Sequence, residues 1–213
     1  MISFIQNYEE NKERIISALK RGKILAYPTD TLFGLGVDAL NVEAVNSLYD
    51  LKKRPKMFPF SIMVSDLSVI LKNVSVPPKV SLFLTKVFPG PVTAVLPLKE
   101  DSLFQSAILK DHYMGFRIPQ HPFCQWLGHN YDHPVVTTSA NPSGKTPLLT
   151  LKDIALYYQH KIDLYIDDPS PDYKHFNKPS TVFKITEEGF FEILREGQIP
   201  RETLKKMYQR CMS

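Results

Sequence analysis

The feature of this sequence that most constrains its fold is a series of short apolar runs that end repeatedly at prolines. The chain has 17 prolines in 213 residues, and most of them lie at the ends of these runs. Because proline fixes φ and removes a backbone donor, it marks the boundaries of elements rather than their interiors. Helical stretches and strand-like runs alternate irregularly, and several strands are consecutive. The pattern favours a single α/β domain over residues 1–213, with a twisted, mixed parallel and antiparallel sheet and flanking helices.

Residue spacing predicts the individual elements. We expect helices over residues 9–20, 42–53, 78–87, 121–128, 151–160 and 201–209. We expect strands over residues 23–27, 60–64, 92–98, 114–118, 135–138, 162–166, 181–185 and 190–194. A chain of this length buries a sizeable core without disulfides or metals.

The composition excludes several classes of protein. Residues 1–20 carry Glu, Lys and Arg throughout and contain no apolar stretch of signal-peptide length. No apolar run approaches the ~18 residues that a membrane span requires. Cys124 and Cys211 show no paired spacing, which argues against a disulfide framework and fits a reducing compartment. We therefore expect a cytoplasmic protein. Its net charge of +4 permits an anionic substrate or a transient RNA contact.

Two polar segments have the complementary chemistry of an anion site. The apolar run 134–138 leads into the turn 139–144 (Ser-Ala-Asn-Pro-Ser-Gly), which offers hydroxyl, amide and backbone N–H groups. The segment 52–56 (Lys-Lys-Arg-Pro-Lys) offers fixed cations, although charge runs are more often a solvated helix end. Lys52 and Arg54 would point ~200° apart on a continuous helix. They converge on a phosphate only if the chain unwinds close to the proline that follows.

Other segments allow both a structural and a functional interpretation. Residues 28–36 (Pro-Thr-Asp-Thr-Leu-Phe-Gly-Leu-Gly) are either a strand-to-turn cap or a pocket wall with hydroxyls and closely approaching backbone. Arg117 lies inside an apolar strand and needs a partner, which is either a structural salt bridge or the carboxylate of a small substrate. Ser180, Thr181 and Arg195 present the same alternatives.

The usual motifs of several reaction types are missing from the sequence. His129 and His133 are four residues apart, but Pro134 interrupts any helix that would align them as metal ligands. We find no nucleophile elbow, no phosphate loop with Gly-Lys-Ser/Thr and no aromatic–basic RNA-binding motif. We therefore expect no metal site made by protein side chains and no protein nucleophile.

A series of short motifs extends over roughly residues 10–200. They are Thr29-Asp30-Thr31-Leu32-Phe33-Gly34-Leu35-Gly36, Lys52-x-Arg54-Pro55, Phe88-Pro89-Gly90-Pro91-Val92-Thr93, Gly115-Phe116-Arg117-Ile118-Pro119, Ser139-Ala140-Asn141-Pro142-Ser143-Gly144, Pro179-Ser180-Thr181-Val182 and Leu194-Arg195-Glu196-Gly197. Each motif is common by itself, but their order is specific. In this order the chain resembles the YrdC family.

The resemblance implies a twisted mixed α/β domain with a basic concave cavity. It implies a nucleotidyltransferase that condenses L-threonine, bicarbonate or CO2, and ATP into threonylcarbamoyl-AMP and pyrophosphate, with Mg²⁺ accompanying the nucleotide. The product would pass to a separate tRNA threonylcarbamoyl transferase complex. A weak contact with tRNA or double-stranded RNA is also compatible with the resemblance.

The resemblance also assigns roles by motif. The positions expected to act in catalysis and to bind the nucleotide are Lys52, Arg54, Ser139 and Asn141, with Arg195 also near the nucleotide. The positions expected to bind threonine are Thr31, Arg117 and Ser180.

A competing interpretation comes from another class of protein. A non-catalytic module could bind double-stranded RNA or tRNA through the same basic cavity. Pyrophosphate release from ATP in the absence of RNA separates the two, because only the enzyme would show it.

Overall fold

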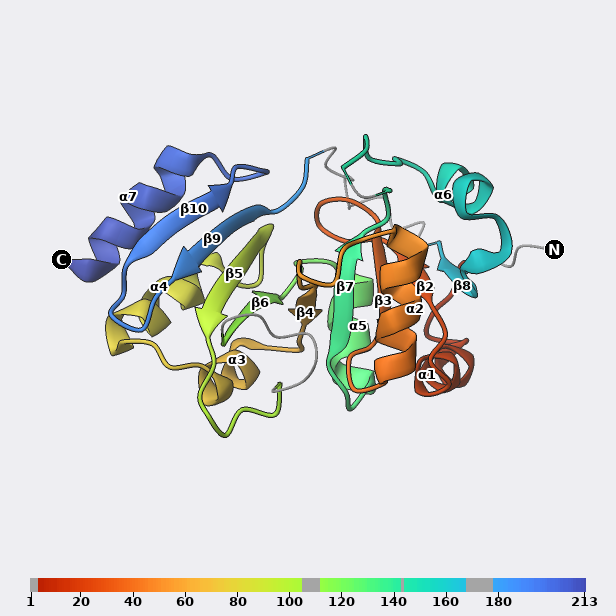
Figure 1. Cartoon of the computed structure of the whole chain (residues 1–213), viewed down its shortest axis with the longest axis horizontal. Coiled ribbons are helices and arrows are strands. Elements are labelled where there is room, and N and C mark those ends of the chain that lie inside the picture. The colour runs from red at the N-terminus through yellow and green to blue at the C-terminus, as the bar shows by residue number, and fades with distance from the viewer. Residues whose placement is uncertain (1–3, 105–111, 143, 168–177) are drawn as a thin grey trace.

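A computed structural model describes residues 4–104, 112–142, 144–167 and 178–213. Helices and strands alternate irregularly along the chain (Figure 1). The helices are α1 (Lys12–Lys20), α2 (Val42–Lys52), α3 (Leu67–Asn73), α4 (Pro78–Val87), α5 (Pro122–Asn130), α6 (Leu151–Tyr158) and α7 (Arg201–Met212), with a 3-10 helix, η1, at Gln159–Lys161. The strands are β1 (Phe4–Ile5), β2 (Leu25–Tyr27), β3 (Gly34–Asp38), β4 (Ser61–Met63), β5 (Val92–Pro97), β6 (Tyr113–Arg117), β7 (Val135–Ser139), β8 (Leu164–Ile166), β9 (Thr181–Ile185) and β10 (Phe191–Arg195). Within the described ranges, no helix combines the length and the apolar character needed to cross a membrane.

These strands form one sheet in the order β1-β8-β2-β3-β7-β4-β6-β5-β9-β10. The pairs β1–β8, β2–β8, β4–β6 and β5–β9 are parallel, and the remaining pairs are antiparallel. Segments far apart in the sequence therefore lie side by side, and the sheet twists strongly along its length (Figure 1). The expected single α/β domain with a mixed sheet and flanking helices is confirmed.

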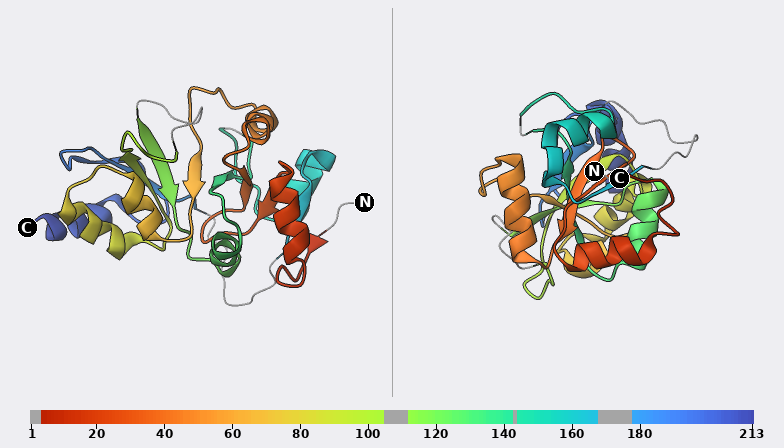
Figure 2. Two further views of the ribbon diagram at one scale, coloured as in Figure 1. Left: turned by 90° about the horizontal axis from the view of Figure 1, so that it is seen from below. Right: turned by 90° about the vertical axis from the view of Figure 1, so that its right-hand side faces the viewer.

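Side chains alternate between the two faces of each strand, and the two faces of the sheet are covered differently. One face carries the larger core, which packs against α2, α3, α4, α6 and α7. The other face carries a smaller core, in which Tyr27, Met63 and Val135 pack with side chains of α1 and α5. Among the described residues, this smaller core takes no side chain from β5, β6, β9 or β10. Figure 2 shows α4 and α7 on one side of these strands and no described helix on the other.

Helix α2 begins and ends at defined positions. Its C-terminal end determines the path of the basic segment 52–56. The side chain of Asn41 accepts a hydrogen bond from the Ala44 amide at 3.0 Å, which caps the first turn. The helix ends at Lys52 because Lys53 adopts a left-handed conformation with φ of 48°. The chain therefore leaves the helix between Lys52 and Arg54, as convergence of these two residues requires.

Most expected elements are confirmed to within a few residues, and α4 and β9 agree at both ends. The sequence analysis did not predict β1, α3 or β3. Residues 34–36, which the sequence analysis interpreted as part of a strand-to-turn cap or a pocket wall, belong to β3, and Gly34 also lines the cavity described below. The structure shows a reason for glycine at position 36. A Cβ atom there would lie 2.8 Å from Cε1 of Tyr27 and 2.9 Å from Cγ1 of Val135, so glycine makes room for the buried Tyr27 ring.

The substitution Gly36→Ala should therefore lower the free energy of unfolding by about 1–3 kcal/mol, because the added methyl group overpacks the core beside Tyr27. Urea denaturation followed by circular dichroism measures this change. Lys86→Ala, at an exposed position of α4, is the control and should change the value by less than about 0.5 kcal/mol. Equal stability of Gly36→Ala and the wild-type protein would contradict this packing account.

Candidate active site

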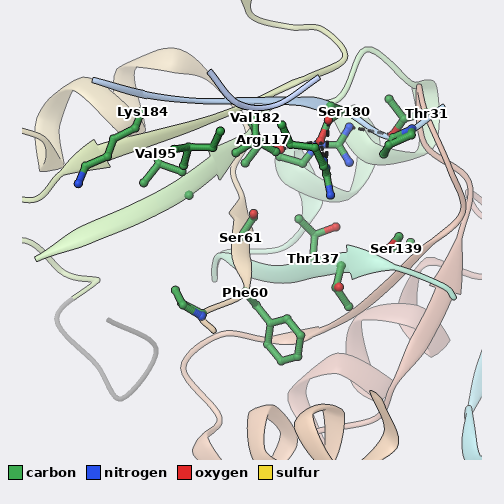
Figure 3. A pocket seen from close by; sticks show the side chains of 18 of the residues that line it. Thr31, Phe60, Ser61, Val95, Arg117, Thr137, Ser139, Ser180, Val182 and Lys184 are labelled. Carbon is green, nitrogen blue, oxygen red and sulfur yellow. Dashed lines mark hydrogen bonds between the residues drawn. The ribbon is translucent and has the colours of Figure 1, made fainter. Parts of the chain in front are cut away.

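The part of the sheet without a helical cover holds an open cavity of about 500 Å³, a size typical of small-molecule sites. Its floor consists of alternate residues of neighbouring strands: Ser61, Thr93, Gly115, Thr137 and Val182. Figure 3 shows Ser61, Thr137 and Val182 around this space. Small and polar side chains keep the floor open and provide hydrogen-bonding groups for a polar ligand.

Arg54 forms one wall of the cavity and is held in place by its own loop. Its Nε donates to the Phe58 carbonyl at 2.9 Å, and its Nη2 donates to the Pro59 carbonyl at 3.1 Å. Its guanidinium carbon lies 5.3 Å from the centre of the Phe60 ring, a cation–π distance. Burial lowers the pKa of this guanidinium, which nevertheless stays charged at neutral pH. The cavity therefore has a fixed cation at this wall.

Lys52 connects the basic segment to the turn after β7. Its side chain is buried, and its ammonium group donates to the main-chain carbonyls of Ser139 and Asn141. Burial, and to a smaller extent the charge of Arg54, lowers the pKa of this ammonium group to about 8. The two polar segments that the sequence analysis singled out therefore do meet in space.

The turn after β7 presents Ser139 to the cavity, whereas Asn141 stabilises the turn itself. The side-chain nitrogen of Asn141 donates to two main-chain carbonyls of the same turn, both at 2.9 Å. The described lining residues include Arg54 and Ser139, but neither Lys52 nor Asn141. The four residues thus form one connected group, in which two face the cavity and two support the turn. Ser143, also in this turn, lies outside the described residues.

Arg117 is paired within the protein and also lines the cavity. Its Nη2 donates to Oδ1 of Asp30 at 2.7 Å and to Oγ1 of Thr31 at 3.1 Å. The other carboxylate oxygen of Asp30 accepts the Gln120 amide at 3.0 Å. The Nε of Arg117 is buried and has no hydrogen-bond partner among the described residues. Of the two alternatives for Arg117, the structural salt bridge is therefore present, and Arg117 also lines the cavity.

The loop between β2 and β3 brings Thr31 to Arg117. The hydroxyl of Thr29 donates to the Leu32 carbonyl at 2.7 Å and accepts the Thr31 amide at 3.1 Å. These local bonds fix a turn of the kind that Ser and Thr stabilise. Thr31 therefore lines the cavity, while Thr29 holds the turn.

Ser180, just before β9, belongs to a small polar network with Thr93 and Arg195. The Ser180 hydroxyl lies 2.8 Å from the Thr93 hydroxyl. Nη2 of Arg195 donates to the Ser180 carbonyl at 3.0 Å and to its hydroxyl at 3.3 Å. Burial, then repulsion from Arg117 and from Arg54, lowers the pKa of Arg195. An anion bound among these arginines would relieve that repulsion.

The charged side chains that line the cavity are mostly basic. The cations among the described lining residues are Arg54, Arg117, Lys184 and Arg195, and the carboxylate among them is Glu192. A concave site lined mainly by one sign of charge concentrates ligands of the opposite sign. The cavity therefore suits an anionic ligand.

Six of the eight residues that the sequence analysis assigned to the site line the cavity: Thr31, Arg54, Arg117, Ser139, Ser180 and Arg195. The other two, Lys52 and Asn141, do not line it and hold the turn after β7. Ser61, Thr93 and Thr137 also line the cavity and Asp30 contacts Arg117, and none of these four was assigned. A signal for Asp30 was present, because an arginine inside an apolar strand requires a carboxylate partner. The remaining three residues reach the cavity through the strand order, which the sequence does not reveal.

The described residues contain no group of three or more His, Cys, Asp or Glu side chains placed to hold a metal ion. Nδ1 of His133 lies 2.9 Å from the carboxylate of Asp38, which also accepts the Tyr131 hydroxyl at 2.8 Å. His133 thus has a structural partner and is not among the described residues that line the cavity.

Comparisons with known proteins agree with this architecture. A family model described as "Telomere recombination", covering Sua5, YciO and YrdC, matches residues 17–197. A protein of Methanocaldococcus jannaschii, whose name marks it provisionally as a threonylcarbamoyl-AMP synthase, is 35% identical over 97% of each chain. The threonylcarbamoyl-AMP synthase of Photobacterium profundum is 33% identical over 68% of this chain and 80% of its own. The crystal structure of P. abyssi Sua5 complexed with L-threonine has a TM-score of 0.82 and 27% identity, and covers 97% of this chain. This chain spans 60% of that Sua5 chain.

The fold and these matches define an enzyme of the nucleotidyltransferase type. The chain belongs to the Sua5/YciO/YrdC family, and the resemblance carried by its motifs is confirmed.

Removal of the Asp30 carboxylate would leave the buried Arg117 guanidinium without its charged partner. Asp30→Ala should therefore lower the free energy of unfolding by about 3–5 kcal/mol. The same change in an Arg117→Met background should have a clearly smaller effect, because no buried charge is then left unpaired. Urea denaturation of the four proteins measures this coupling. Equal effects of Asp30→Ala in the two backgrounds would show that the ion pair contributes nothing.

The lowered pKa of Lys52 predicts a pH dependence of stability. The native protein releases this proton near pH 8, whereas the unfolded chain releases it near 10.5. The unfolding free energy of the wild-type protein should therefore rise, relative to Lys52→Met, as pH increases from about 8 to 10.5, and should stay level relative to this variant below and above that range. Urea denaturation across this range tests the effect. Leu149→Ala, which removes no titrating group, is the control. If the difference in unfolding free energy between the wild-type protein and Lys52→Met stayed constant across this pH range, the prediction would be wrong.

Proposed function

We propose that this chain is a threonylcarbamoyl-AMP synthase, which condenses L-threonine, bicarbonate or CO2, and ATP into threonylcarbamoyl-AMP and pyrophosphate. The observation that carries the proposal is that the Arg54–Ser139 group and the Arg117–Ser180–Arg195 group line one cavity. The first group suits phosphate oxygens, and the second suits a carboxylate and a hydroxyl. The names of the relatives and the threonine bound in the P. abyssi structure support this assignment.

The proposed chemistry needs alignment and charge neutralisation rather than a protein nucleophile. The threonine amine adds to CO2 and loses a proton to give a carbamate. A carbamate oxygen then attacks the α-phosphorus of ATP, so a new P–O bond forms while the bond to pyrophosphate breaks. Preorganised donors and cations are the main contributions that a protein makes to such a transfer. The cavity supplies both kinds of group.

Each group then has a proposed role. Arg54 and Ser139 contact the phosphates, and Lys52 and Asn141 hold the turn that presents Ser139. Arg195 stabilises negative charge between the phosphates and the carbamate.

The other end of the cavity is proposed to take the amino acid. Arg117 binds the threonine carboxylate from the cavity wall, while Asp30 fixes the orientation of the guanidinium. The hydroxyls of Thr31 and Ser180 complete this threonine site.

The described lining residues include a single carboxylate, Glu192, so they do not form a magnesium site of the usual oxygen-rich kind. A Mg²⁺ ion that arrives with ATP would be held by phosphate and water oxygens. The proposed product, a reactive mixed anhydride, would pass to a tRNA threonylcarbamoyl transferase complex for attachment to tRNA.

The alternative, a non-catalytic module for double-stranded RNA or tRNA, is tested by the same assay that tests the enzyme. The wild-type protein should release pyrophosphate from ATP only when both threonine and bicarbonate are present, with no RNA added. The alternative predicts no release and an RNA affinity that falls steeply with salt.

Arg54→Ala should keep the fold but lower threonine- and bicarbonate-dependent pyrophosphate release by about 10²–10³-fold, because a fixed cation at the phosphates is lost. A coupled phosphate assay on the purified protein measures the rate. Lys56→Ala is the matched control, since Lys56 is exposed on the same segment and donates to Asn46 at 2.7 Å. Near-normal turnover of Arg54→Ala would remove the role proposed for this residue.

A further inference from the structure

A second cavity, of about 390 Å³, lies apart from the candidate active site. Helix α3, the end of α5 and the segments that follow β4 and precede β7 contribute to its lining. Figure 1 shows α3 and α5 on either side of β4. The described residues that line this cavity include none that line the active-site cavity. Its volume is within the range of small-molecule sites, and none of the roles proposed above falls on it.

The floor of the second cavity is apolar and buried. Met63, Phe104 and Val135 line it, and each is 3% exposed or less. Tyr131 also lines it, and its hydroxyl is already used in a hydrogen bond to Asp38 at 2.8 Å. Apolar surface of this kind takes the apolar body of a ligand, and the faces of aromatic rings also attract cations.

The rim on the α5 side carries three exposed side chains, those of His129, Asp132 and His133. Nδ1 of His129 lies 2.6 Å from the Gln125 carbonyl, and Nδ1 of His133 lies 2.9 Å from the Asp38 carboxylate. Carbonyl and carboxylate oxygens accept hydrogen bonds, so both imidazoles carry their proton on Nδ1. Nε2 of each neutral ring is therefore an acceptor, and this rim offers two imidazole nitrogens and a carboxylate to a donor.

The charges at this cavity favour a cation. Asp132 lies on the rim, and the Asp38 carboxylate lies directly behind it. Hydrogen bonds, above all that from the Ser68 hydroxyl, lower the pKa of Asp66, which caps α3 beside the cavity. The cation among the described lining residues is Lys72, on the α3 side. Three carboxylates thus face one ammonium group, and the C-terminal end of α5 adds partial negative charge.

The spacing of the rim acceptors favours an organic cation over a metal ion. Within the described ranges, no three His, Cys, Asp or Glu side chains are placed to hold a metal ion together. A planar amidinium or guanidinium group carries several N–H donors that point in different directions. Such a group reaches acceptors that are spread over residues 129–133, and it stacks on aromatic surface.

We propose that the second cavity binds a small amphipathic cation, whose amidinium or guanidinium group donates to Asp132 and to the two histidines while its apolar body lies on the buried floor. Lys72 limits the affinity through repulsion. This inference does not depend on the proposed function, because no described residue lines both cavities.

Titration of the full chain with benzamidine, followed by NMR of the backbone amides, tests this inference. Benzamide and benzoate have a similar size and shape but carry no charge and a negative charge, respectively. Benzamidine should bind with a Kd of about 1 mM, as expected for a ligand of so few atoms. It should shift the amide signals of residues 72–73 and 128–133. Benzamide should bind more weakly than benzamidine, and benzoate should bind most weakly of the three.

Two substitutions of exposed side chains should change the affinity for benzamidine in opposite directions. Asp132→Asn removes the rim carboxylate and should weaken binding about threefold to fivefold. Lys72→Gln removes the repelling ammonium group and should strengthen binding about twofold. Asp50→Asn, at an exposed position of α2 outside this lining, is the matched control and should leave the affinity unchanged. The amide spectrum of each variant shows whether its fold is retained.

Several outcomes would overturn the inference. They are equal binding of the three compounds, tighter binding of benzoate than of benzamidine, unchanged affinity of Asp132→Asn, and shifts centred on Arg54 and Arg117 instead of the second cavity. Each of these results would leave the synthase proposal intact, because pyrophosphate release is assigned to the other cavity. A wild-type protein that bound benzamidine as described but released no pyrophosphate would contradict the proposed function alone.

Discussion

The site depends on one constraint: one face of strands β5, β6, β9 and β10 has no described helix over it. Strands β5, β6, β9 and β10 place apolar side chains in the large core on one face, where α4 and α7 cover them. Their other face cannot be apolar without leaving a large hydrophobic patch in water. Hydroxyls, glycine backbone and arginines occupy it instead, and these are the groups that bind a polar anion. The same alternation that builds the core therefore builds the floor of the cavity.

The arginines of the cavity are fixed before any ligand arrives. Arg54 is held by carbonyls of its own loop, Arg117 by Asp30, and Arg195 by Ser180. Lys52 joins α2 to the turn after β7, so the position of Ser139 depends on a buried ammonium group. The lowered pKa values of Arg54 and Arg195 reflect the burial of positive charge in one place. A site of this kind is preorganised for negative charge, because its donors need not reorganise when the charge develops.

The sequence predicted those elements whose first and last residues are determined by the local sequence. Helix α4 begins at Pro78, which is favourable in a first turn, and β9 is a compact apolar run. Strand β3 was missed because the reason for its glycines is the Tyr27 ring, which belongs to a neighbouring strand. The motifs located Arg54, Arg117, Ser139 and Ser180, yet the sequence did not tell which side chains face the cavity. That distinction depends on hydrogen bonds to residues far along the chain, such as those from Lys52 to the turn after β7.

The most direct test of the account is a crystal structure of the protein with L-threonine and an ATP analogue that cannot be cleaved between its α- and β-phosphates. The account predicts both ligands in the one cavity, with phosphate oxygens against Arg54 and Ser139 and the threonine carboxylate against Arg117. The amino group of threonine should lie on the side of the ligand that faces the α-phosphorus. Either ligand bound outside this cavity, or the two bound too far apart to react, would contradict the account.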